Sequence, residues 1–146
     1  MENFATAYQF TKKWEGGYVF DSTDMGGETK YGISKRSYPH LNIKNLTMED
    51  AERIYKRDFW DAMLCDEYTW PLCLVIFDTA VHSGVHRCRK WVERLKGDDA
   101  IKTADLLKTR EDFYKRIAER DPTQKKFLKG WLNRINDLKR SIGYAR

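Results

Sequence analysis

The segment between Pro71 and Gly84 limits the possible folds of this chain more than any other. Nearly all of its side chains are apolar, and Asp78 is the one acidic residue among them. Proline favours the first turn of a helix and glycine favours its end. A helix that is apolar on most sides has to be buried on most sides. We therefore expect this helix at the centre of the core, with the rest of the chain packed around it.

Other segments repeat apolar residues at spacings of three and four, which predicts amphipathic helices. Thr47 is the predicted N-cap of one of them, with Glu49 and Asp50 in its first turn. The chain has 146 residues, of which 41% are hydrophobic, enough to fill one core but not two. We therefore expect a mainly α fold and a single compact domain over residues 1–146. The predicted helices lie in residues 4–14, 48–59, 71–83, 91–95, 101–117 and 128–142.

Residues 16–34 break this helical pattern. They are rich in Gly, Asp, Ser and Thr, which is typical of turns and short strands. The alternation from Thr29 to Ile33 predicts a strand, and Ser34 offers an N-cap for a short turn of helix. The fold class is thus mainly α, of the α+β type, with one small β-rich excursion near residues 16–34.

Charge is distributed unevenly along the chain, whose net charge is +5. Residues 1–73 hold 9 Lys and Arg against 12 Asp and Glu, whereas residues 74–146 hold 18 against 10, giving −3 and +8. A basic half attracts polyanions such as nucleic acid, anionic lipid or a bacterial wall. Charge alone does not choose among them, and an ordinary solvated helix surface would give the same count.

Cysteine usage argues against a disulfide framework, because Cys65, Cys73 and Cys88 are odd in number and irregularly spaced. We expect buried free thiols. A zinc site built from them with His82 and His86 is a weaker alternative, since no pair has the short Cys-x-x-Cys spacing.

The chain shows neither a secretory signal pattern nor an apolar run near the ~20 residues that cross a bilayer. We therefore expect a soluble protein, made in the cytoplasm without a signal peptide.

Chemistry is concentrated between Trp14 and Ile33, where Glu15, Asp21 and Asp24 stand among five glycines. Hydrolysis of a glycosidic bond needs a protonated carboxyl group for the leaving oxygen and a second group that stabilises the sugar cation or orients water. Glu15 would end a helix, where the macrodipole disfavours its ionised form, and Trp14 and Tyr18 would partly desolvate it. Both effects raise a pKa, as a general acid requires.

A longer pattern surrounds these residues. It runs through Glu15-Gly-Gly-Tyr18, Asp21, Asp24 and Gly26-Gly27-Glu-Thr29-Lys-Tyr31-Gly32-Ile33-Ser34, and continues at Phe77-Asp78-Thr-Ala80-Val81-His-Ser-Gly84 and Gly130-Trp131-Leu-Asn-Arg134. This pattern closely resembles glycoside hydrolase family 108, which is found in phage endolysins and bacterial secretion activators. The resemblance implies a lysozyme-like fold, with a catalytic segment over about residues 7–90 and a helical peptidoglycan-binding segment over about residues 72–146.

The resemblance also implies an activity: an N-acetylmuramidase that cleaves the β-1,4 bond between N-acetylmuramic acid and N-acetylglucosamine in peptidoglycan, for lysis of a host cell. Glu15 is then the catalytic acid, and no metal or cofactor is needed. The order Glu15, Asp24, Thr29 is similar to that of phage-type lysozymes, which implies that Asp24 and Thr29 position the water for an inverting attack. Asp21 is the competing second carboxylate.

Several other side chains allow two interpretations, as substrate contacts or as structural residues. Tyr18, Asp21, Tyr31 and Trp60 are candidate substrate contacts, although aromatic residues at regular spacing are more often core residues. The acids and Thr29 could equally be turn residues.

Polar residues of the central helix and its neighbour raise the same question. Asp78 has to be paired if it is buried, and Arg134 or Arg110 would serve. For His82 and His86 a simple hydrogen-bonded histidine is the default expectation over titration in the cleft.

The leading hypothesis is thus a monomeric enzyme that acts on bacterial peptidoglycan, at the cell wall or in the periplasm, without binding nucleic acid or inserting into a membrane. A non-catalytic wall-binding or virion structural protein is the alternative, and the intact Glu15 argues against it. A nucleic-acid-binding helical module would have no use for the acidic, glycine-rich segment near the N-terminus.

Overall fold

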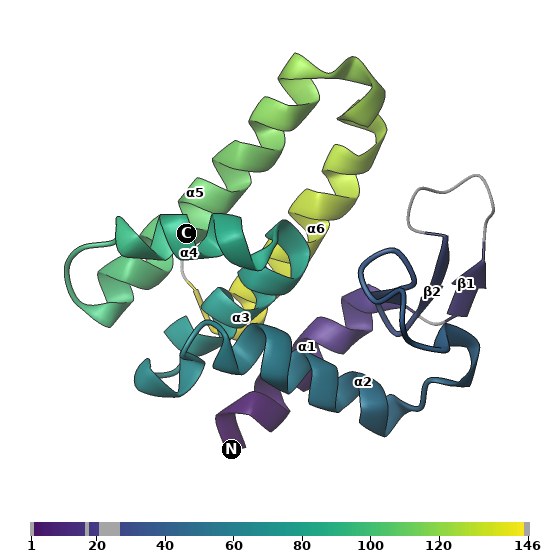
Figure 1. Cartoon of the computed structure of the whole chain (residues 1–146). Coiled ribbons are helices and arrows are strands. Elements are labelled where there is room, and N and C mark those ends of the chain that lie inside the picture. The colour runs from purple at the N-terminus through teal and green to yellow at the C-terminus, as the bar shows by residue number, and fades with distance from the viewer. Residues whose placement is uncertain (1, 17, 21–26, 145–146) are drawn as a thin grey trace.

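The structure of the chain is a computed structural model that describes residues 2–16, 18–20 and 27–144. Figure 1 shows a mainly helical body with a small sheet, as the sequence predicts. The main helices are α1 (Glu2–Glu15), α2 (Met48–Tyr55), α3 (Leu72–Ser83), α4 (Val85–Glu93), α5 (Asp99–Arg120) and α6 (Lys125–Ser141). Short helical turns join them: η1 (Ile43–Asn45), η2 (Lys56–Asp61), η3 (Cys65–Glu67) and η4 (Pro122–Gln124).

Helix α3 is the central element, as its apolar sequence predicts. Every side chain from Leu72 to Ala80 is buried, and α1, α4 and α5 all pack against the helix. The helix ends at Gly84, whose φ of +96° is unfavourable for other residues. Because Asp78 lies on this helix, the fold carries one carboxylate into its own centre.

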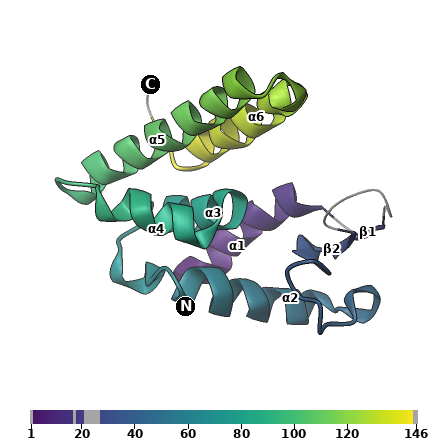
Figure 2. The same ribbon diagram turned by 45° about the horizontal axis from the view of Figure 1, so that its top comes forward.

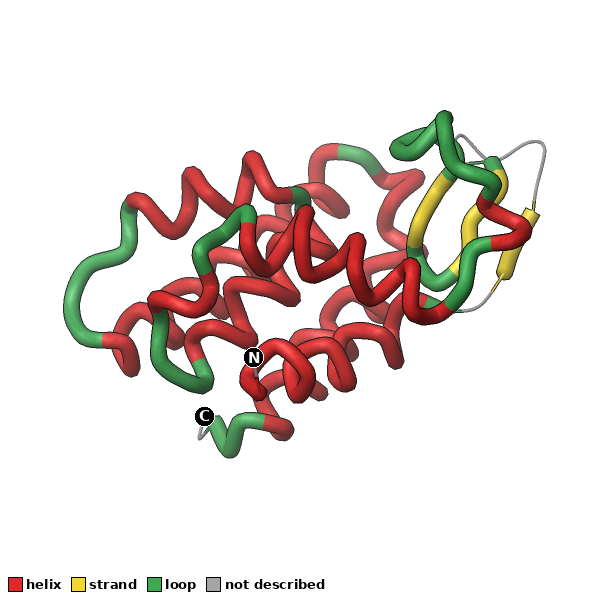
Figure 3. The backbone as a smooth tube through the Cα atoms, turned by 60° about the horizontal axis from the view of Figure 1, so that its bottom comes forward, coloured by secondary structure: helices red, strands yellow, loops and turns green. Residues whose placement is uncertain are grey.

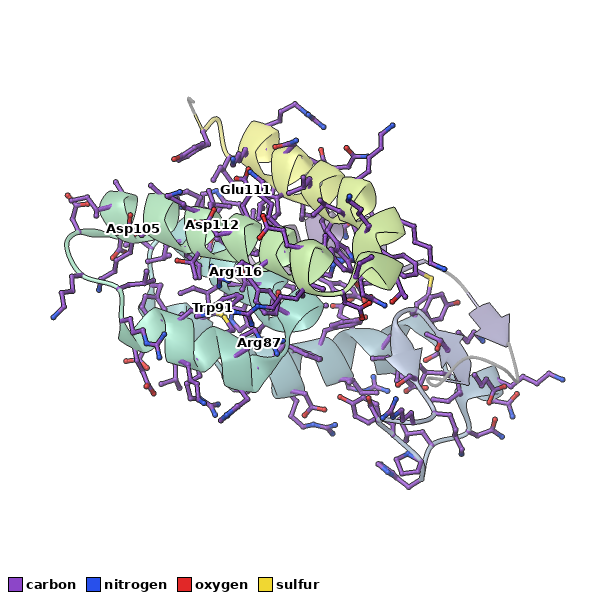
Figure 4. All side chains as sticks on the ribbon, turned by 90° about the horizontal axis from the view of Figure 1, so that it is seen from above. Arg87, Trp91, Asp105, Glu111, Asp112 and Arg116 are labelled. Carbon is purple, nitrogen blue, oxygen red and sulfur yellow. The ribbon has the colours of Figure 1, made fainter. Side chains whose placement is uncertain are left out.

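Helices α5 and α6 form a hairpin that lies across one side of α1 and α3 (Figure 2). Figure 4 shows Glu111 between the two helices, where its carboxylate binds the ammonium group of Lys139 at 3.1 Å. On the other side of α5, Arg87 and Trp91 of α4 lie between the two helices (Figure 4) and pack against the ring of Phe113. The second half of the chain is therefore packed onto the first.

The predicted start of α2 is confirmed in detail. The Thr47 hydroxyl accepts a hydrogen bond from the amide of Asp50 at 3.0 Å, and the Asp50 carboxylate accepts one from the amide of Thr47 at 3.1 Å. This capping box satisfies two amide groups that the first turn of a helix leaves free. The predicted ends of α1 and α3 also agree with the structure, whereas α4 spans Val85–Glu93 in place of the predicted residues 91–95, and α5 extends past residue 117 to Arg120.

Three short antiparallel strands lie at one end of the helical body (Figure 3), namely β1 (Tyr18–Phe20), β2 (Glu28–Lys30) and β3 (Ile33–Ser34). Thr29 pairs with Val19 on one side and Ser34 on the other. The prediction of one continuous strand from Thr29 to Ile33 is wrong, because Tyr31 and Gly32 form a turn with φ values of 53° and 82°.

Candidate active site

Glu15 is the last residue of α1, and Gly16 stops the helix there with a φ of +67°. The Glu15 side chain is 17% exposed, so most of it is shielded from water. One turn earlier on α1 is Thr11, which is completely buried. The last turn of α1 thus runs from the buried core at Thr11 to the partly exposed Glu15 carboxylate at the edge of the core.

The two Glu15 oxygens have different partners. Oε2 accepts a hydrogen bond from Nη1 of Arg134 at 2.6 Å, which makes a charge-assisted ion pair. Oε1 lies 3.5 Å from the Tyr55 hydroxyl. That hydroxyl donates its single proton over the shorter distance, 2.7 Å, to the backbone oxygen of Tyr31. A lone pair of the phenol oxygen is therefore left to face Oε1.

Burial and charge act on Glu15 in opposite directions. Desolvation raises the pKa of its carboxyl group, while the Arg134 guanidinium lowers it; the net result is a pKa above the ordinary value. Buried Tyr55 has a raised pKa as well and stays a neutral phenol. A carboxyl group with a raised pKa at the edge of the core can act as a proton donor near neutrality.

Asp78 anchors the arginine that holds Glu15. Its two oxygens accept hydrogen bonds from Nη2 and Nε of Arg134 at 2.9 and 3.2 Å, from Nη2 of Arg110 at 2.7 Å, and from the Thr11 hydroxyl at 2.7 Å. Asp78 itself is fully buried. The expectation that a buried Asp78 needs an arginine is confirmed, and both Arg110 and Arg134 are used.

Although burial opposes ionisation, the two guanidinium groups hold the pKa of the Asp78 carboxyl well below its usual range. The carboxylate therefore stays charged at any pH at which the protein is expected to work, and it fixes the position of Arg134.

His82 extends the network from the far side of Arg110. Its Nδ1 lies 3.0 Å from Nη2 of Arg110 and 2.7 Å from the Tyr114 hydroxyl, which also contacts the Ser83 hydroxyl at 2.6 Å. Since arginine only donates, Nδ1 is unprotonated and the ring carries its proton on Nε2. Burial and the Arg110 charge lower the pKa of His82 to about 3. His82 is therefore the neutral, hydrogen-bonded histidine that was expected.

The turn between strands β2 and β3 lies against Tyr55 and Glu15. The turn after β2 places the backbone of Tyr31 against Tyr55 and places Gly32 directly beside Glu15. Thr29 lies on β2, partly buried. Asp21 and Asp24, the two candidates for the second carboxylate, lie outside the described residues, as does the side chain of Tyr18.

Gly32 offers a direct test of this packing. A Cβ atom there would lie 2.6 Å from Oε1 of Glu15 and would collide with the Tyr55 hydroxyl. Gly32→Ala is therefore expected to lower the free energy of unfolding by more than the 1–2 kcal/mol or so of a left-handed alanine, and to reduce activity by about 10²-fold by displacing Glu15. Urea unfolding and initial rates on cell walls measure the two effects.

Gly27→Ala is the matched control. Gly27 has a φ of +64°, but a Cβ atom there would meet no atom of the described residues within 4 Å. This variant should show only the backbone effect and keep near-normal activity. Equal losses in both alanine variants would contradict a close contact between Gly32 and Glu15.

One tryptophan differs from its predicted role, and a second lies partly at the surface. Trp60 was a candidate sugar platform, but its ring is completely buried against Phe4 and Phe77, and its Nε1 donates to Asp66 at 2.9 Å. It is a core residue with no face open to a ligand. Trp14 is 36% exposed, and its Nε1 donates to Asp137. Among the described residues, Tyr55, Gly32 and Arg134 lie next to the Glu15 carboxylate.

Two known families match parts of this chain. Residues 8–84 match the family Glycosyl hydrolase 108. The chain belongs to this family. Residues 85–136 match a second family, described as Predicted Peptidoglycan domain. The protein is thus a glycoside hydrolase that acts on peptidoglycan, and the predicted family is confirmed.

A solved structure extends the comparison. The family 108 chain is similar to the structure of Brucella abortus SagA, with a TM-score of 0.75 and 23% sequence identity over 99% of this chain and 97% of the other. At this identity the likeness concerns the fold. No curated protein matches the sequence.

The two matched segments of this family 108 chain meet at Glu15. Glu15, Tyr55 and Asp78 belong to residues 8–84, whereas Arg110 and Arg134 belong to residues 85–136. The contacts of Tyr55 and Arg134 with Glu15 were missed by the sequence analysis. A signal for Arg134 was present, because it stands within the apolar stripe of α6.

The remaining observations concern other sites. The larger of two described cavities, about 970 Å³, is lined by residues of α2 and by Phe4, not by Glu15. Among the described residues, no His, Cys, Asp and Glu group could hold a metal ion, and no helix is long and apolar enough to cross a membrane. Cys65, Cys73 and Cys88 are free and buried.

Proposed function

We propose that this family 108 chain is an N-acetylmuramidase that cleaves the β-1,4 bond between N-acetylmuramic acid and N-acetylglucosamine, with Glu15 as the general acid. The observation that carries the proposal is the position of Glu15: partly buried at the end of α1, with a raised pKa and one oxygen held by Arg134.

Each Glu15 oxygen has a distinct role in this proposal. Oε2 is occupied by the charge-assisted bond from Arg134, so the acidic proton resides on Oε1, which faces the lone pair of Tyr55. When substrate binds, Oε1 passes this proton to the glycosidic oxygen as the bond to the sugar carbon breaks. Water then adds to that carbon, and its proton leaves to a base. Asp24 and Thr29 are the proposed groups that orient the water, and Asp21 is the alternative carboxylate.

The products test this function. Purified peptidoglycan digested by the protein should gain new reducing ends, and borohydride reduction followed by mass spectrometry should find them on N-acetylmuramic acid. Proton NMR of the first product formed should show the inverted α-anomer. Reducing ends on N-acetylglucosamine would contradict the bond specificity, and an initial β-anomer would contradict inversion. A folded protein that releases no sugar would favour the wall-binding alternative.

Arg134 should set the alkaline limit of this activity. Its charge lowers the pKa of Glu15 against the effect of burial, so removing the charge leaves burial unopposed. In Arg134→Gln the protonated acid should persist to higher pH, and the alkaline limb of the kcat/KM profile should move upward. Arg134→Lys, which keeps the charge, should move it less. If the alkaline limb lies at the same pH in the wild type, Arg134→Gln and Arg134→Lys, then the charge of Arg134 does not act on the pKa of Glu15 and this prediction is wrong.

The biological setting that we propose is lysis of a bacterial host by a phage endolysin. Production in bacteria together with a protein that opens the inner membrane should lyse the cells. Lysis that is equally fast with a Glu15→Gln variant would contradict a role for the enzymatic activity.

A further inference from the structure

Three side chains form a stripe along one face of α6. Phe127, Trp131 and Arg134 follow one another at spacings of four and three residues, so they lie above one another on the helix. Arg134 is at the inner end of the stripe, bound to Glu15 at 2.6 Å. With a rise of about 1.5 Å per residue, Trp131 lies about 4.5 Å and Phe127 about 10.5 Å further along the axis. The stripe therefore leads directly away from the catalytic carboxyl group.

The two rings of the stripe make a firm apolar surface. Phe127 stacks on Trp131, with ring centroids 6.0 Å apart and an interplanar angle of 28°. Trp131 rests in turn on Tyr114, at 5.4 Å between centroids, and the Tyr114 hydroxyl is fixed by Ser83 and His82. Phe127 is nevertheless 46% exposed. The α5–α6 hairpin that carries it projects beyond the core (Figure 1), so the exposed ring adds little to the packing of α3.

A glycan strand fits this surface. Sugar rings present apolar C–H faces that stack on aromatic rings, while their hydroxyl groups stay in water. Lys126 places its ammonium group 5.2 Å from the Phe127 centroid, and Lys129 is exposed nearby on α6. These cations suit the carboxylates of the peptide stems that peptidoglycan carries.

We propose that Phe127 and Trp131 form a glycan-binding extension of the active site, which holds sugars of the peptidoglycan strand beyond the pair that is cut. Both residues lie in the segment that matches the Predicted Peptidoglycan domain, residues 85–136. The proposal rests on the proposed function, because it takes the strand to be cut at Glu15. It assigns the binding role of the second segment to one face of one helix.

Binding without catalysis is measured first, in the Glu15→Gln background, by calorimetry with purified, solubilised glycan strands. Adding Phe127→Ala should raise Kd about fivefold to tenfold, as expected for the loss of one stacked ring. The matched control is Ile101→Ala, which removes an apolar side chain that is 51% exposed on α5; its Kd should not change. An unchanged Kd in the Phe127 variant would overturn the proposal.

Kinetics with the otherwise wild-type protein give a second readout. Phe127→Ala should raise KM for long strands with kcat unchanged, and should leave the cleavage of the shortest cleavable fragments unaffected. Trp131→Ala should have a larger effect, and Trp131→Phe should restore much of the affinity; thermal melts show which variants are folded. An equal loss of kcat/KM on short and long substrates would overturn the proposal that Phe127 and Trp131 extend the active site.

The two proposals fail separately in these experiments. If the wild-type protein cuts no strand while Phe127-dependent binding persists, the proposed hydrolytic function fails and the glycan-binding surface stands. If cutting is normal and neither Kd nor KM responds to Phe127, only the surface fails.

Discussion

Glu15→Gln is expected to lower kcat on peptidoglycan by about 10³-fold while leaving the fold intact. Glutamine has nearly the same shape, and its oxygen still accepts a hydrogen bond from Arg134, but it has no acidic proton to give to the leaving oxygen. Release of reducing sugar measures the rate. The matched control is Glu119→Gln, which removes an exposed carboxylate from α5 and should behave as the wild-type protein does.

The stability of Glu15→Gln should show whether a loss of activity comes from the missing acid or from unfolding. Because the pKa of Glu15 is raised in the folded protein, the folded state binds the proton more tightly than the unfolded chain. The free energy of unfolding therefore falls as pH rises through the window between the unfolded and folded pKa values. Glutamine lacks this effect, so at pH 7 the variant should melt no lower than the wild-type protein. A folded Glu15→Gln protein with near-normal activity would contradict the assignment of the acid.

Asp78→Asn is expected to lower the free energy of unfolding by about 3–5 kcal/mol at pH 7. The substitution leaves Arg110, fully buried, and Arg134, 4% exposed, without their shared counter-charge. Urea unfolding measures the loss. Asp137→Asn is the matched control: Asp137 also pairs with basic side chains, Lys13 and Arg140, but at the surface, where such pairs contribute about 0–1 kcal/mol.

The pH dependence of this loss follows from the lowered pKa of Asp78. A lowered pKa means that the stabilisation is present above the unfolded value, near about 4, and is lost as pH falls towards the folded value. The difference between wild type and Asp78→Asn should thus be constant from about pH 5 to 8 and shrink below about pH 4. A small, pH-independent loss equal to that of Asp137→Asn would contradict the buried ion-pair network.

Much of the fold could be predicted from local patterns. The apolar run before Gly84 predicts a buried helix because no other environment suits it, and the capping box at Thr47 and Asp50 acts within four residues. The strand prediction failed at Tyr31 because a positive φ in a residue other than glycine has no local signature. Trp60 shows the same limit, since spacing alone does not distinguish a buried ring from an exposed one.

The site was predictable only in part. Glu15 follows from its place before two glycines and within the family pattern, and an ionised Asp78 on an apolar helix requires a cation nearby. The pairing of Glu15 with Arg134 spans 119 residues, and such a contact depends on how the α5–α6 hairpin packs. The position of Arg134 in an apolar stripe indicates a buried partner but does not say which carboxylate it binds.

The ion pair between Glu15 and Arg134 also bears on protein engineering. Wall hydrolases are attractive subjects for exchange of recognition modules, in which one enzyme receives the targeting segment of another. Here the segment that would be exchanged, residues 85–136, contributes the guanidinium groups of Arg110 and Arg134 that fix Asp78 and Glu15. Such an exchange would replace residues that contact the proposed general acid, and a donor segment would have to supply two arginines at the same places before it could provide a new binding specificity.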